Sequence, residues 1–109
     1  MKSEISVAAN LGYDADDKPE IGIKISAEQY ELNVSVKQEE AELFSKVRDA
    51  DWDKRGSLRI GTCANAPAFW CCKDDEVSIL VGEYDESWDF CVTVPASVVD
   101  EILSEIKAL

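Results

Sequence analysis

Residues 21–36 read IGIKISAEQYELNVSV, and this stretch decides the fold. Isoleucine occupies every second position from Ile21 to Ile25, with glycine and lysine between. After a polar interval the same two-residue period returns in Tyr30, Leu32, Val34 and Val36. Alternation of apolar and polar residues is typical of strands that bury one face. The stretch therefore predicts two consecutive one-sided strands of an antiparallel sheet.

A third strand of the same kind comes before this pair. Apolar residues again take every second place: Ile5, Val7, Ala9 and Leu11. Residues 13–19 follow as an acidic loop, YDADDKP, and its closing proline is typical of a turn. We expect residues 5–11 to pair with the strand at 21–25 as a hairpin.

The apolar period becomes helical after residue 37. The apolar positions there fall at spacings of three and four, with charged residues on the other face: Ala41, Leu43, Phe44 and Val47. This spacing predicts a helix near residues 38–52, with Trp52 at its end and Gly56 as a stop signal.

The second half of the chain predicts four short strands and a final helix. The strands are expected at 57–63, 68–72, 77–83 and 88–94, with a break at 65–67 and acidic turns between the later ones. Pro95 suits the first turn of a helix, expected near 96–108. Its apolar stripe is Val98, Val99, Ile102, Leu103 and Ile106. We expect Ile102 and Ile106 to be core residues.

These elements predict one α+β domain over residues 1–109, in the order β-β-β-α-β-β-β-β-α. A largely antiparallel sheet of six to seven strands would carry two helices packed on one face. A chain of 109 residues has no room for two ordinary cores. One-sided strands suit this design, because the other sheet face can remain in contact with water.

Charge restricts the possible partners. The chain has 23 acidic and 11 basic residues and no histidine, which gives a net charge of −12. Nucleic acid and anionic membrane surfaces attract basic proteins, so the sequence predicts neither as a partner. A basic protein domain is the expected partner, and improved solubility is the alternative explanation of the charge. No signal-peptide pattern or membrane-spanning run is present, so a cytoplasmic location is expected.

The sequence predicts no enzyme, cofactor or metal site. It has no histidine to serve as a general base, and its five glycines are scattered rather than grouped in a phosphate loop. The Asp14–Asp17 run lacks the glycine and the distant glutamate of a calcium loop. The cysteines do not have zinc-site spacing, and we expect free thiols at Cys63, Cys71, Cys72 and Cys91.

Aromatic residues set among carboxylates are the candidate partner-binding sites, because Trp and Tyr dominate interface hot spots. Three groups fit this description: Trp52 with Asp53; Tyr84, Asp85, Glu86, Trp88 and Asp89; and Asp14, Asp16 and Asp17 beside Tyr13. Other interpretations remain open. Trp88 alternates in phase with Phe90 and Val92, which favours the core, and Trp52 fits core or surface. Acidic turns are also common as solvated loops.

The small size, acidic charge, absent secretion signal and mixed architecture resemble the immunity proteins of bacterial toxin–immunity systems. They equally resemble DNA-mimicking phage inhibitors of restriction and CRISPR systems. Both resemblances imply a stoichiometric inhibitor, in the first case of a cationic toxin domain that is often a nuclease. No shared motif accompanies them, so they imply no site residues. The alternative is a small cytosolic structural module that buries a sheet face or edge strand against its own copy.

Overall fold

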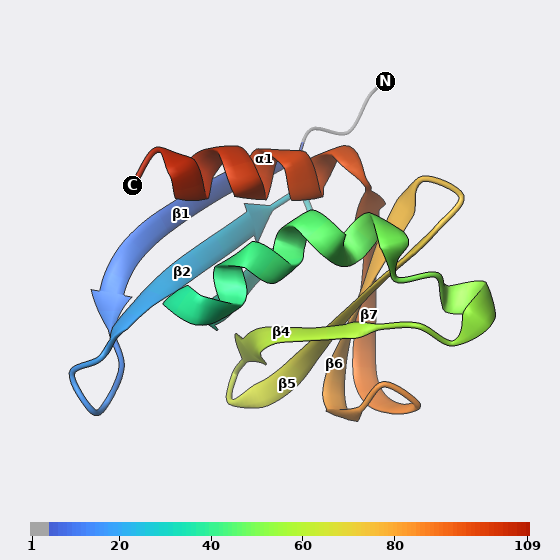
Figure 1. Ribbon diagram of the computed structural model, residues 1–109, viewed down its shortest axis with the longest axis horizontal. Helices are drawn as coiled ribbons and strands as arrows, with labels where there is room; N and C mark the ends of the chain where they lie inside the picture. The colour runs from blue at the N-terminus through green and yellow to red at the C-terminus, as the bar shows by residue number, and fades with distance from the viewer. Residues whose placement is uncertain (1–4) are drawn as a thin grey trace.

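The computed structural model describes residues 5–109 as a seven-stranded antiparallel sheet with helices on one face (Figure 1). Each strand is hydrogen-bonded to the next one in the chain, so the sheet order is the sequence order. The strands are β1 Ser6–Tyr13, β2 Pro19–Ser26, β3 Glu31–Lys37, β4 Leu58–Cys63, β5 Ala66–Lys73, β6 Glu76–Tyr84 and β7 Ser87–Pro95. The predicted fold class and the predicted order of elements are confirmed.

The first helix is a 3-10 helix, η1, over Gln38–Asp49, followed by a single short turn, η2, at Trp52–Lys54. The predicted helix at 38–52 is therefore present but ends three residues earlier. A 3-10 helix has three residues per turn. That period places the apolar side chains of this segment on one stripe toward the sheet: Ala41, Phe44, Val47 and Ala50.

The core lies between the sheet and the helix layer. η1 packs against β2 to β5, and the C-terminal helix α1, Ser97–Lys107, packs against β1 and η1. Phe44 meets Trp70 edge to face, with ring centroids 5.0 Å apart, and the Trp70 Nε1–H donates to the Ile60 carbonyl at 3.0 Å. Ile102 is fully buried as predicted, whereas Ile106 is only partly buried against the core.

A bulge in β4 brings this strand close to β3 and gives it a contact with η1. The pairing with β5 shifts between Arg59 and Thr62, and Gly61 in this interval has a φ of +73°. A Cβ at Gly61 would lie 2.5 Å from the Ser35 carbonyl oxygen, so only glycine fits. The Gly61 N–H donates to the Glu40 carboxylate at 3.3 Å, which links η1 to the bulge.

The expected break at 65–67 is wrong in detail. The turn between β4 and β5 consists of Ala64 and Asn65, both with positive φ, and Ala66 and Pro67 already belong to β5. Two left-handed residues make a tight hairpin whose twist matches that of the strands.

The prediction that Trp88 belongs to the core is also wrong, because its side chain is 46% exposed. Phe90 pairs with Val81 but Trp88 pairs with Gly82, so Asp89 is an extra residue in β7. Such a bulge breaks the inward–outward alternation on which the prediction depended. β7 is also an edge strand, and the helices pack mainly on β1 to β5.

Candidate functional site

The structure brings two of the three acidic–aromatic groups together and leaves the third apart. The Arg55 guanidinium, just after η2, pairs with Glu86 at 2.6 Å, and the Ser57 hydroxyl donates to Asp85 at 2.7 Å. The η2 loop is therefore tied to the turn between β6 and β7. The Asp14–Asp17 loop joins β1 to β2 at the opposite end of the sheet (Figure 1).

Trp52 and Asp53 are engaged within the molecule. The Arg55 guanidinium lies 4.2 Å from the centre of the Trp52 ring, and Asp53 pairs with Lys73 at 3.0 Å. The Asp51 carboxylate accepts the backbone N–H of Asp53 at 2.9 Å and so caps η2. Trp52 is partly buried as a result. These two predicted site residues help to hold the η2 loop in place, although the Asp53 side chain remains exposed, and their role in partner binding stays a prediction.

The end of the β6–β7 hairpin, residues 83–90, carries three exposed aromatic side chains, and we call it the β6–β7 tip. Tyr84 is 61% exposed, and Trp88 and Phe90 are 46% and 41% exposed. Asp85 is partly buried, and Glu86 is held by Arg55. Within residues 5–109, the exposed carboxylates of Glu83 and Asp89 have no ion pair or hydrogen bond.

Gly82 sets the shape of this tip. A Cβ at Gly82 would lie 2.5 Å from the Trp88 Cα and 2.8 Å from the Asp89 nitrogen, so the two strands approach closely because this residue is glycine. Gly82, Glu83, Arg55 and Phe90 were not predicted as site residues. The sequence does contain one signal for the residues of the hairpin, though none for Arg55: no lysine or arginine occurs between Lys73 and Lys107.

The Asp14–Asp17 loop, the third predicted site, has a mainly local structural role. The Asp14 carboxylate accepts the backbone N–H groups of Asp16 at 2.8 Å and Lys18 at 2.9 Å. The hydrogen bond from Lys18 is the main cause that lowers the pKa of Asp14. Asp14 therefore shapes the β1–β2 turn, whereas Asp16 and Asp17 remain exposed.

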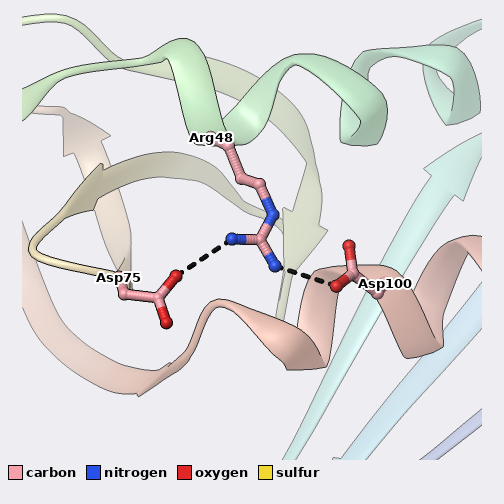
Figure 2. A network of polar contacts seen from close by, with 3 residues as sticks. All are labelled: Arg48, Asp75 and Asp100. Atoms are coloured by element: carbon pink, nitrogen blue, oxygen red, sulfur yellow. Dashed lines mark hydrogen bonds and ion pairs between the residues drawn. The ribbon is translucent and has the colours of Figure 1, made fainter.

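Figure 2 shows a charged network that joins three elements. Arg48 of η1 donates to Asp75, in the β5–β6 turn, at 3.0 Å and to Asp100 of α1 at 2.8 Å. These two hydrogen bonds, led by that to Asp100, raise the pKa of Arg48. A polar hollow of about 560 Å³ lies beside the network and contains Asp51, Cys72 and Lys73. Two of its cations pair with carboxylates of the lining, Arg48 with Asp75 and Lys73 with Asp53, so we interpret the hollow as structural.

Cysteine chemistry does not distinguish a catalytic site. All four cysteines are free thiols; Cys63 and Cys71 are buried, and Cys91 is exposed. Burial raises the pKa of Cys71 to about 11, so it is a poor nucleophile at neutral pH.

Among the residues that the structure describes, no three His, Cys, Asp or Glu side chains are placed to hold a metal ion. The helices in the same part of the chain are too short or too polar to cross a membrane.

Comparison with known proteins found no matching family model, no matching curated protein and no matching solved structure. The function must therefore be inferred from the geometry and charge of this chain.

Proposed function

We propose that this protein is a stoichiometric inhibitor that binds a basic protein domain through the β6–β7 tip. The exposure of Tyr84 and Trp88 carries this proposal, together with the carboxylates of Glu83 and Asp89, which have no partner among the described residues 5–109. Exposed aromatic side chains supply the apolar area of interface hot spots. Carboxylates around them complement a basic patch and favour its approach. The proposal contains no catalytic step and no cofactor.

The proposed target is a cationic toxin domain, for example a nuclease, as in toxin–immunity systems. The net charge of −12 supports this choice, because a strongly acidic inhibitor is steered toward a basic target by long-range attraction. The charge is unevenly placed, since residues 74–106 contain no lysine or arginine. Such a surface also repels nucleic acid, which would otherwise compete for a nuclease.

Association kinetics test the proposal directly. The partner in this test is a basic protein domain recovered with this protein by pull-down, and association rates are measured as salt rises from about 0.05 to 0.5 M. The double variant Glu83→Gln and Asp89→Asn should slow association at least about threefold and flatten its salt dependence. Its fold should persist, because neither carboxylate has a partner among the described residues.

The matched control is Asp16→Asn with Asp17→Asn in the β1–β2 turn. It removes the same number of charges without disturbing the hydrogen bonds of Asp14. Equal slowing by both double variants would mean that net charge alone acts, and that the β6–β7 tip is not the interface.

A second candidate function, self-assembly, is favoured by the other edge of the sheet. β1 pairs with β2 in an uninterrupted register from Ser6 to Tyr13 and contains no charged residue. Unblocked edge strands of this kind are templates for pairing with another strand. Sedimentation at increasing concentration tests this candidate. A dimer that is lost in Asn10→Lys would support it, and a monomer at millimolar concentration would exclude it.

A further inference from the structure

The molecule already contains one example of how its acidic–aromatic surface holds a cation. Arg55 stacks its guanidinium 4.2 Å above the centre of the Trp52 ring and pairs with the Glu86 carboxylate at 2.6 Å. The cation is therefore held by an aromatic face and a carboxylate together. Glu86 belongs to the β6–β7 tip, so this arrangement already includes one carboxylate of the tip.

The tip itself repeats the same groups but lacks a cation of its own. Trp88 is followed directly by Asp89, and Tyr84 is preceded directly by Glu83. The aromatic side chains are about half exposed, and the two carboxylates are unpaired within residues 5–109. The hairpin from β6 to β7 carries no lysine or arginine, so no cation from these two strands can fill the surface.

We infer that the β6–β7 tip selects arginine over lysine in its partner, with Trp88 and Tyr84 as stacking platforms and Asp89 and Glu83 as charge partners. This inference rests on the proposed function, because it names the chemistry of the partner that binds at the same surface. The partner is an exposed, arginine-bearing segment of a basic protein.

Arginine fits this surface better than lysine for two physical reasons. The guanidinium is planar and weakly hydrated, so it stacks on an indole or phenol ring at low desolvation cost. It also keeps N–H groups in its own plane, and these donate to a carboxylate at the ring edge while the ring face stays covered. A lysine ammonium is a compact, strongly hydrated point charge and obtains mainly the electrostatic part of the interaction.

Three heptapeptides of alternating sequence test the inference: one of arginine and valine, one of lysine and valine, and one of citrulline and valine. The first two have the same charge, and citrulline keeps the shape of arginine without its charge. Binding is followed by NMR at low salt through the backbone amide signals of residues 83–90, which every variant keeps. The indole N–H of Trp88, assigned by its loss in Trp88→Leu, is a second reporter in the proteins that retain Trp88. We expect the arginine peptide to bind about fivefold or more tightly than the lysine peptide. The citrulline peptide should bind more weakly than both.

Variants separate stacking from charge. Trp88→Leu keeps every charge and should remove most of the arginine preference while lysine-peptide binding changes little. Tyr13→Leu is the matched control, because Tyr13 is an exposed aromatic residue beside Asp14 on the distant β1–β2 hairpin. It should leave the preference intact. Far-ultraviolet circular dichroism of each variant checks that the fold is kept.

The outcomes distinguish this inference from the proposed function. Equal binding of the arginine and lysine peptides would overturn arginine selection and leave a charge-driven inhibitor standing. A preference that survives Trp88→Leu but is lost in Trp52→Leu would overturn the assignment to the tip. Absence of binding by all three peptides would overturn the inference, whereas the proposed function is judged by the association rates of the whole basic domain.

Discussion

Single residues at the β6–β7 tip decide which side chains are available to a partner. Gly82 allows the backbone of Trp88 to come close to β6, and Asp89 adds the extra residue that breaks the alternation of β7. Together they leave the indole of Trp88 about half exposed at an edge strand. A residue without a side chain thus controls the exposure of the largest aromatic side chain at the tip.

Gly82→Ala should lower the free energy of unfolding by about 1–3 kcal/mol, because the new Cβ must displace the backbone of β7. Urea unfolding measures the change, and indole N–H shifts report whether Trp88 moves. Gly12→Ala in β1 is the control, since a Cβ there would meet no atom within 4 Å. Gly12→Ala should be neutral or slightly stabilising, because alanine restricts the unfolded chain. Equal costs at both glycines would show that the close approach at Gly82 is not responsible.

Thiol reactivity should follow burial. Cys91 is exposed, whereas Cys71 is buried with its pKa raised to about 11 by desolvation. At pH 8 about one Cys71 thiol in a thousand would be ionised, and the thiolate is the reactive form. Iodoacetamide labelling followed by peptide mass spectrometry should therefore modify Cys91 long before Cys71. Raising the pH toward 11 should accelerate the labelling of Cys71. Rapid labelling of Cys71 at pH 7 would contradict the packing of β5.

Buried apolar contacts and a surface network of charges hold the helices in different ways. α1 buries Ile102 completely against the sheet and η1, while Ile106 sits at the margin of the core. Arg48 then joins η1, α1 and the β5–β6 turn through Asp100 and Asp75 at the molecular surface. The apolar contacts supply stability, and the charged network fixes how the helices lie relative to each other.

Ile102→Ala should destabilise the protein by about 2–5 kcal/mol, because it leaves a cavity under α1. Ile106→Ala should cost less than half as much, since its side chain is partly exposed already. Thermal and urea unfolding of both variants give the comparison. Equal losses would mean that α1 packs differently from the arrangement described.

Arg48→Gln should lower the melting temperature slightly at low salt, and the deficit should shrink as salt rises. The Arg48 side chain is 45% exposed, so its ion pairs are screened by dissolved ions. The variant Asp100→Asn, which removes the charge of one partner carboxylate, should reproduce part of the decrease in melting temperature. The double variant should lower the melting temperature by less than the sum of the two single decreases. Full additivity would show that the two residues do not act together.

The whole molecule carries far more negative than positive charge. A net charge of −12 on 109 residues opposes the compact state through self-repulsion, and it supports rapid encounter with a basic partner. The structure concentrates this imbalance, because residues 74–106 provide β6, β7 and most of α1 without a basic side chain. Stability and the proposed function therefore make opposite demands on the same carboxylates.

The melting temperature of the unmodified protein should rise when sodium chloride is increased from about 0.02 to 0.3 M, because screening relieves this repulsion. Differential scanning calorimetry provides the measurement. The variant Glu83→Gln with Asp89→Asn should be more stable than the parent at low salt. A parent protein that loses stability as salt rises would show that favourable ion pairs outweigh the repulsion.

The sequence determined the class and order of the fold, because burial on one side of a strand leaves a two-residue period that needs no partner to be recognised. It predicted strands such as the one at 21–25 and placed Ile102 in the core.

Tertiary structure decided the rest. η1 is a 3-10 helix that places Phe44 against Trp70 of a distant strand, and the bulge at Asp89 depends on the register of β7 against β6. The sequence could name Trp52 and Trp88 as candidates. Only the fold showed that Arg55 covers the Trp52 ring and that the Trp88 side chain is exposed. Exposure and ion pairing depend on segments far apart in the chain, and such contacts leave no local period in the sequence.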